Sequence, residues 1–411
     1  MTSPQLVVCG IGSGMDRSLL TIRNMGYSPV VLTDQVTPTV RQLAEKIIEV
    51  YPRNLDAVLE RMTDVTLRDP AGVLSLGYEN PPVISGLAEK LGTPGLPSEV
   101  ALNCTNKGRR IAILDSRGIR VPRYRAAGNT PLALAALEEI GRPAVVKPVD
   151  LTSSLGVARI GPDTTDSAIR KLIQYALHLS PSSRVLIEEY LEGTEHTVEG
   201  VRDHGVVHIT GVSDRNYSEK HRFAPFFFDN GDTLPSTLDS LSLSHVIDEC
   251  VRAAGELELD PAVFSCDVLR THSGEVVILE VAGRMAGSRF GTEIVPLSTG
   301  IDVLPSAVRM SVGERVREDE VTPLRNRAVV LRYLAIGGGL VTEVSKLPSP
   351  ATMGVYDLFW ENRPTVGKKL PQPRSAKDIV AGAIADAESL AEAERLAASA
   401  LASIRITVKE S

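Results

Sequence analysis

The sequence is poor in the features that mark several common classes of protein. Aromatic residues make up 4% of its 411 residues, and no apolar run approaches the ~18 residues of a membrane span. No G-x-x-x-x-G-K-[ST] segment occurs, so the most familiar phosphate-binding loop is absent. Residues 1–13 lack the basic stretch and apolar core of a signal peptide. We therefore expect a cytoplasmic protein with no membrane partner.

Cysteine and positive charge are also scarce. The four cysteines contain no C-x-x-C pair, so we expect buried free thiols in a reducing compartment. Lys and Arg number 44 against 51 Asp and Glu, and the net charge of −7 argues against a nucleic-acid partner. Apolar residues reach 43%, which is typical of a globular chain. Its length predicts about two to four domains.

The first hundred residues alternate apolar strands with amphipathic helices. Strands are expected at 6–9, 30–32 and 73–76, and helices at about 19–25 and 81–91. This alternation predicts a Rossmann-like domain with a parallel, doubly wound sheet.

A glycine-rich turn, Gly10-Ile11-Gly12-Ser13-Gly14, follows the first strand, and Asp34 follows the second. Together they suggest a dinucleotide fingerprint, but Met15 stands where G-x-G-x-x-G requires its third glycine. We prefer a simple turn into a helix, whose N-terminal N–H groups could face an anion such as a carboxylate.

Charged residues sit inside apolar strands in the middle of the chain. Lys147 ends one such strand, while Asp267 and Glu280 interrupt two others, at 262–269 and 276–281. Buried charges of this kind are costly unless they are paired or bind a metal. If the two strands form a hairpin, both carboxylates can project from one face and hold Mg²⁺.

Two further features complete a nucleotide site. Lys107 lies near the start of a helix expected at 106–117, and a loop of small residues follows Lys147 at 150–157. Two lysines, a glycine-containing loop and two carboxylates predict a nucleoside triphosphate site without a Walker motif.

The order of these segments along the chain resembles that of the ATP-grasp superfamily. The layout of the whole chain resembles the L-amino acid ligase branch of the carboxylate–amine ligases. Six segments carry the resemblance: the helix with Lys107, Val145-Val146-Lys147-Pro148, Ser153-Ser154-Leu155-Gly156-Val157, Ile187-Glu188-Glu189-Tyr190-Leu191-Glu192-Gly193-Thr194-Glu195, Cys266-Asp267-Val268 and Glu280-Val281-Ala282-Gly283-Arg284. It implies a multidomain α/β and α+β fold, in which a Rossmann-like domain precedes two ATP-grasp subdomains that clamp ATP and a small C-terminal α/β region. The expected boundaries are 1–98 for the N-terminal domain, 99–190 for the linker helix and lid, 191–325 for the core with the metal site, and 326–411 for the C-terminal subdomain.

The resemblance implies how ATP phosphates would be held. Lys107 and Lys147 would bind them, and a loop containing Ser153, Ser154 and Gly156 would close over them through its backbone N–H groups. The lid at about 121–191 would exclude water.

The resemblance also implies how the nucleoside would be held. Glu188 would accept a hydrogen bond from the adenine amino group. The backbone at Tyr190 and Leu191 would contact the adenine edge, and Glu195 would bind the ribose hydroxyls.

The metal and the reacting groups complete the implied site. Asp267 and Glu280 would hold Mg²⁺, with Mn²⁺ as an alternative, and Arg284 would stabilise the transferring phosphoryl group or a substrate carboxylate. The sequence departs from the family at Ala282, where many relatives have Asn, so the second metal position is in doubt. It departs again at Asp232, where relatives often have His, so no histidine role is assigned there.

The implied activity is ATP-dependent C–N ligation. An amino-acid carboxylate would form an acyl phosphate, and an amine, preferably a second amino acid, would displace phosphate to leave an amide, with ADP as the other product. A carboxylase-type enzyme that uses bicarbonate remains an alternative, and a nucleotide- or NAD-binding protein without ligase activity is a more distant one. A homodimer is expected by analogy with the family.

Two segments contain candidate residues for substrate contacts. Residues 214–222 are dense in charge, and the next six residues contain four of the seven phenylalanines. This stretch is either a solvated loop before a buried strand or a specificity loop in which Arg215 or His221 meets an α-carboxylate. Arg289 is a second candidate for that contact.

The C-terminal part is expected to be a further α/β unit. Strands are predicted at 328–334, 379–385 and 404–408, and a capping box at Ser389 predicts a helix to about residue 402. One long helix from residue 381 is the alternative, because this stretch is rich in alanine.

Overall fold

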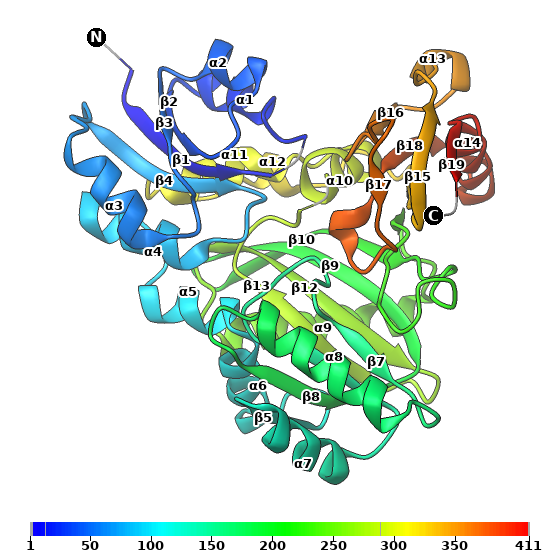
Figure 1. Cartoon of the computed structure of the whole chain (residues 1–411). Coiled ribbons are helices and arrows are strands. Elements are labelled where there is room, and N and C mark those ends of the chain that lie inside the picture. Colours follow the sequence, from blue (N-terminus) through cyan, green and yellow to red (C-terminus); the bar gives the residue numbers. More distant parts are fainter. Residues whose placement is uncertain (1–2, 13, 288, 410–411) are drawn as a thin grey trace.

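A computed structural model describes residues 3–12, 14–287 and 289–409, so Ser13 of the glycine-rich turn and Ser288 lie outside it. The described residues form sheets of four, eight, four and three strands. Figure 1 shows the N-terminal domain and the C-terminal part side by side above the large central sheet, with the lid below. The predicted α/β and α+β fold is confirmed, with a parallel sheet in the N-terminal domain; the central sheet contains antiparallel strands. No helix among these residues has the length and apolar character to cross a membrane.

The N-terminal domain is a parallel sheet in the order β3-β2-β1-β4. Its strands are β1 (Gln5–Ile11), β2 (Ser28–Thr33), β3 (Lys46–Glu49) and β4 (Pro70–Leu76), and its helices are α1 (Ser18–Asn24), α2 (Pro38–Leu43), α3 (Leu55–Thr63) and α4 (Pro81–Leu91). The predicted elements are confirmed, whereas α2, β3 and α3 had not been predicted. The edge strand β3 has one buried residue among its four. A strand this exposed needs few apolar residues, so its sequence gives a weak strand signal.

The two faces of this sheet are covered by different parts of the chain. Val7 and Cys9 pack with α3 and α4 on one face. Leu6 and Val8 pack on the other with α1 and with α11 (Val303–Ser311), which is distant in sequence. Helix α11 therefore joins the N-terminal domain to the rest of the molecule.

The lid is a four-stranded antiparallel sheet in the order β5-β8-β6-β7, packed with two helices. Its elements are β5 (Tyr124–Ala127), α7 (Thr130–Ile140), β6 (Ala144–Pro148), β7 (Ala158–Ile160), α8 (Asp166–Leu179) and β8 (Val185–Glu189). Helices α5 (Ser98–Thr105) and α6 (Lys107–Ser116) precede it and pack on the central sheet.

The central sheet runs in the order β13-β12-β9-β10-β11-β14-β18-β16. Its first part comprises β9 (Gly193–Asp203), β10 (Val206–Arg215), β11 (Asp232–Leu234), β12 (Ala262–Thr271) and β13 (Val276–Ala282), with α9 (Ser240–Glu256) packed against it. The condition set for a shared face of the two carboxylates is met: β12 and β13 form an antiparallel hairpin, and Asp267 lies directly opposite Glu280. All four cysteines are buried and free, as predicted.

The C-terminal part continues this sheet. The segment that leads into it contains η1 (Phe290–Ile294), α10 (Val295–Thr299) and α12 (Glu318–Val321). The elements of the C-terminal part are β14 (Ala328–Leu334), β15 (Gly339–Val344), α13 (Pro350–Met353), β16 (Asp357–Trp360), β17 (Lys369–Leu370), η2 (Ala376–Asp378), β18 (Ala381–Ala387), α14 (Leu390–Ala402) and β19 (Ile406–Lys409). Of these, β15, β17 and β19 form a separate three-stranded sheet. Because β14 pairs with β11, the expected boundary at 325/326 falls within one continuous sheet.

The alternative of one long helix from residue 381 is wrong. Residues 381–387 form a central-sheet strand between β14 and β16, and their small side chains allow close packing on both faces. A Cβ atom at Gly382 would lie 2.3 Å from the Phe359 ring, so only glycine fits there. Ser389 then starts α14 by accepting a hydrogen bond from the Glu392 N–H (3.3 Å).

Candidate active site

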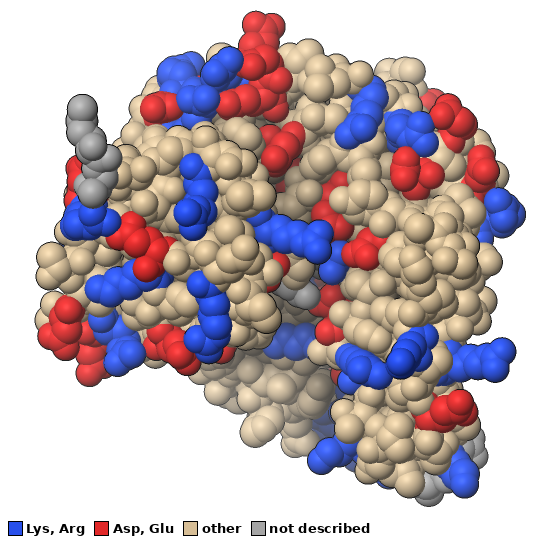
Figure 2. Space-filling model, turned by 90° about the horizontal axis from the view of Figure 1, so that it is seen from above, with Lys and Arg blue, Asp and Glu red and all other residues tan. Residues whose placement is uncertain are grey.

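Two connected cavities lie where the lid, the central sheet, and the N- and C-terminal parts meet. The lid cleft, of about 150 Å³, lies between the lid and the central sheet. The central cavity, of about 730 Å³, extends toward the N- and C-terminal parts. Thr152, Ser153, Ser154, Asp267 and Glu280 line both, so the two cavities are continuous. Figure 2 shows this side of the molecule hollowed between two lobes, with side chains of both charges around the hollow.

Most of the residues predicted from the sequence converge on these cavities. Those that line the lid cleft are Lys107, Lys147, Ser153, Ser154, Glu188, Tyr190, Leu191, Glu195, Asp267 and Glu280. Arg284 and Arg289 line the central cavity, and Arg215 lines both. His221 is exposed and lines neither. The roles assigned to these residues stay predictions.

Lys107 is placed by the start of α6. Asn106 caps this helix by accepting a hydrogen bond from the Arg109 N–H, and Lys107 points inward with 6% of its surface exposed. Its Nζ donates to the Leu151 carbonyl at the start of the small-residue loop and lies 3.4 Å from Glu280. Burial lowers the pKa of Lys107, although Glu280 opposes this.

Glu280 faces a cluster of cations. Arg110, which the sequence analysis missed, lies three residues beyond Lys107 and 3.8 Å from Glu280. Burial raises the pKa of Glu280, but Lys107, Arg110 and Lys147 outweigh it and bring the pKa to about 2. The i, i+3 spacing of Lys107 and Arg110 could have revealed the second cation, because such residues share a helix face.

Lys147 and Glu188 form a buried ion pair at 2.7 Å. They lie on the adjacent antiparallel strands β6 and β8. In this pairing Lys147 lies opposite Leu186, and Val145 lies opposite Glu188. Their exposed fractions are 8% and 3%. Two buried charges that point into the same cleft suit a ligand that has both an anionic and a hydrogen-donating part.

The segment after β8 offers backbone groups to the cleft. The Tyr190 N–H donates to the Pro143 carbonyl (3.1 Å), so it is unavailable to a ligand. Of the predicted backbone contacts, the Tyr190 carbonyl and the Leu191 N–H remain. Glu195 lies farther along the same wall, and burial raises its pKa to about 6 although Arg215 opposes the shift.

The loop after β6 has the conformation of a tight cradle. Ser153 and Ser154 adopt positive φ of 58° and 55°, a conformation that exposes consecutive N–H groups. Gly156 has φ of 79°, and a Cβ there would lie 2.8 Å from Pro148. Gly156 thus lets the loop return against the end of β6.

Asp267 and Glu280 fit a divalent cation that is also bound by oxygens from outside the protein. Asp267 accepts hydrogen bonds from Thr197 (2.8 Å) and Arg215 (2.5 Å). Within the described part of the chain, no group of three or more His, Cys, Asp or Glu side chains is placed to hold a metal. Ala282 is buried and provides no ligand atom. Phosphate oxygens would have to complete the coordination of such an ion.

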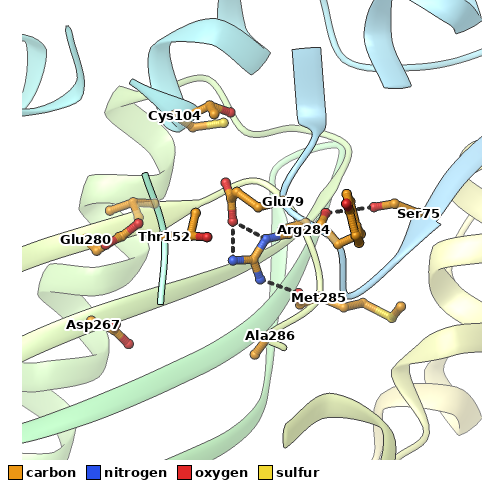
Figure 3. Close-up of polar contacts among 12 residues, drawn as sticks. Ser75, Glu79, Cys104, Thr152, Asp267, Glu280, Arg284, Met285 and Ala286 are labelled. Carbon is orange, nitrogen blue, oxygen red and sulfur yellow. Dashed lines mark hydrogen bonds and ion pairs between the residues drawn. The ribbon is translucent and has the colours of Figure 1, made fainter. Parts of the chain in front are cut away.

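Arg284 links the central sheet to the N-terminal domain. Its guanidinium pairs with Glu79, just after β4, and donates to the Met285 carbonyl (2.8 Å). Figure 3 shows this contact, with Asp267 and Glu280 on the strands beside it. Glu79 was missed, although it follows a parallel strand at the sheet edge where ligands commonly bind.

Glu199 supports the segment that carries Arg284. It is fully buried on β9 and accepts hydrogen bonds from the Ala286 N–H (2.8 Å) and the Thr210 hydroxyl (3.2 Å). Burial raises its pKa to about 7, against the lowering effect of these two donors.

The N-terminal glycines accommodate the protein's own side chains. A Cβ at Gly10 would lie 2.8 Å from the Tyr78 ring, and one at Gly14 would lie 2.8 Å from the Arg289 guanidinium. Helix α1 begins only at Ser18, so its N–H groups are not at this turn. These contacts explain the glycines without a dinucleotide.

Arg289 is held by several partners. It lies 2.7 Å from Asp357 and 3.2 Å from Glu293, and its guanidinium lies 3.7 Å from the centre of the Phe359 ring. Arg215 is likewise paired, with Asp229 and Asp267. Both candidates for substrate contact therefore already have carboxylate partners.

Comparison with known proteins identifies the type of domain. Residues 140–293 match the family model described as the ATP-grasp domain. An uncharacterized protein, y4rH, of Sinorhizobium fredii is 27% identical over 72% of this chain and 60% of its own length. A D-alanine–D-alanine ligase of Pseudomonas entomophila is 26% identical over 48% of this chain and 61% of its own length. The chain thus spans about 60% of the length of these curated relatives.

Several solved structures resemble the whole chain. The L-amino acid ligase of Bacillus licheniformis superposes with a TM-score of 0.81 at 18% identity, covering 100% of both chains. At this identity the match establishes the fold, including the N-terminal and C-terminal parts that flank the domain matched by sequence.

Proposed function

Because this chain carries an ATP-grasp domain in the fold of the ATP-grasp ligases, we propose that it is an ATP-dependent ligase that joins an amino-acid carboxylate to an amine. The second substrate would be another amino acid, and ADP and phosphate would be released. One observation carries the proposal: two buried lysines and two facing carboxylates line a cleft that opens into an arginine-lined cavity.

The lid cleft would hold ATP. Lys107 and Lys147 would place positive charge beside the phosphates, and the Ser153–Ser154 backbone would add N–H donors. Asp267 and Glu280 would hold a magnesium ion, which would supply positive charge beside the phosphate oxygens.

The central cavity would hold the two reacting substrates. The carboxylate of the first would attack the γ-phosphorus, and the ADP oxygen would leave. The nitrogen of the second would then attack the acyl carbon, with phosphate as the leaving group and the amine proton lost. Arg284 would stabilise negative charge at this point, and lid closure would keep water from the acyl phosphate.

The test is to incubate the protein with ATP, magnesium and a matrix of amino-acid pairs, and to measure phosphate release and product mass. We expect at least one pair to give stoichiometric ADP, phosphate and an amide. Asp267→Asn should lower kcat at least about a hundredfold. It should stay folded, because Arg215 keeps Asp229 as a partner.

Two outcomes would contradict the proposal. ADP release that requires bicarbonate and no amine would favour the carboxylase-type alternative. Unchanged turnover in Asp267→Asn would remove this residue from the site.

A further inference from the structure

Among the residues that the structure describes, all but one of the arginines that line the central cavity have an anionic partner. Arg215, Arg284 and Arg289 are each paired with a carboxylate. Arg53, in the segment between β3 and α3, also lines the cavity, and no carboxylate of the described residues forms an ion pair with it. An oriented guanidinium that faces a cavity without an anion is suited to an anionic group of a ligand.

Arg53 is held in place by uncharged groups. Its guanidinium lies 5.1 Å from the centre of the Tyr78 ring, and its Nη2 donates to the Thr152 hydroxyl (3.4 Å). Its Nε is buried and has no hydrogen-bond partner in the described structure. Gly10 allows the Tyr78 ring to pack on the backbone there, so the glycine-rich turn indirectly positions Arg53.

The position of Arg53 is close to where the two substrates would react. Thr152, its hydrogen-bond partner, belongs to the loop that lines both the lid cleft and the central cavity. When an α-amino acid is the amine substrate, its carboxylate and its attacking nitrogen are attached to the same carbon. A group that binds this carboxylate must therefore lie beside the reaction centre.

We propose that Arg53 binds the α-carboxylate of the amine substrate, which makes this substrate an amino acid rather than a simple amine. The inference rests on the ligase function proposed above. Lys377 is the other cavity cation without an ion pair among the described residues, but it is exposed and no contact orients it. The planar fork of Arg53 matches a carboxylate with two parallel hydrogen bonds.

The experiment compares two forms of the same amine substrate. Each amino acid that is active as the amine partner is assayed beside its α-carboxamide, which keeps the nucleophile and lacks the negative charge. In Arg53→Gln, KM for the amino acid should rise by about ten- to a hundredfold. KM for the carboxamide and for ATP should change less than about threefold, and Arg53→Lys should restore part of the loss. Lys377→Gln is the matched control and should leave all three KM values near those of the wild type.

Three results would overturn the inference. Equal losses for the amino acid, its carboxamide and ATP would show that Arg53 only fastens the Thr152 loop. A rise in KM for the amino acid but not for its carboxamide in Lys377→Gln, and not in Arg53→Gln, would assign the carboxylate contact to Lys377. A wild-type protein that forms no amide with any pair would overturn the ligase function itself, and with it this role; the first two results leave that function intact.

Discussion

At the residue scale, the site combines charges that offset one another with a few that do not. Glu280 is held ionised by Lys107 and Arg110, whereas Glu199 is buried with only neutral donors. The same type of carboxyl thus has a pKa near 2 at one place and near 7 at the other. Neighbouring charge decides the first case, and desolvation decides the second.

Glu199 should make stability depend on pH. Its pKa of about 7 in the folded protein lies above the ordinary 4.5. Its contribution is therefore complete below pH 4.5 and is lost as pH rises through 7. In the wild type, the free energy of unfolding should fall by up to about 3 kcal/mol across this range because of Glu199. In Glu199→Gln this part of the fall should be absent.

Denaturant unfolding at several pH values measures this effect. Glu60→Gln, on the exposed face of α3, is the matched control and should keep the wild-type profile. The assignment would be wrong if the Glu199→Gln and wild-type profiles were parallel throughout.

At the element scale, the loop after β6 depends on backbone conformations that its small residues permit. Ser153, Ser154 and Gly156 all have positive φ, and Gly156 additionally packs against Pro148. The family resemblance implied a loop that closes over phosphates, and the structure shows which of its residues needs to be glycine.

We expect Gly156→Ala to raise KM for ATP about tenfold, because the added methyl collides with Pro148 and displaces the loop. Gly118, which follows α6 with φ of 69° and open space around it, gives the matched control. Gly118→Ala should cost about 1 kcal/mol of stability for the backbone conformation alone, with unchanged kinetics. Identical kinetics in the two variants would show that the loop tolerates the displacement.

At the scale of the whole molecule, the C-terminal part completes the core. Val329, Leu331 and Ile384 pack with Phe290 and Ile294 in one cluster. Asp357 and Phe359 of β16 also hold Arg289. The last third of the central sheet is thus both a structural and a cavity-forming unit.

A chain that ends at residue 325 should therefore fail to fold into a soluble monomer, because β11 and this cluster would lose their partners. The matched control is a chain that ends at residue 404, which removes residues 405–411 and with them β19, the half-exposed edge strand paired with β15. It should remain folded with lower stability. Size-exclusion chromatography and thermal unfolding followed by near-UV circular dichroism compare the two. A monodisperse, cooperatively unfolding 1–325 fragment would contradict this prediction and would support the domain boundary expected from the sequence.

Local sequence patterns determined the type of the N-terminal sheet and the positions of two carboxylates within strands. Alternating apolar strands and helices specified the N-terminal sheet, and Asp267 and Glu280 inside apolar strands indicated carboxylates that need a charged partner or a metal. These features depend on the spacing of apolar residues along the sequence and on the cost of burying a charge. Both can be recognised within a few neighbouring residues.

Only the tertiary structure decided how distant segments share partners. It paired Arg284 with Glu79, added Arg110 to the Glu280 cluster, joined the C-terminal strands to the central sheet and gave Arg53 no ion pair with a carboxylate of the described residues. Whether a charge is neutralised or available depends on which groups the fold brings within a few ångströms, and sequence spacing does not contain that distance.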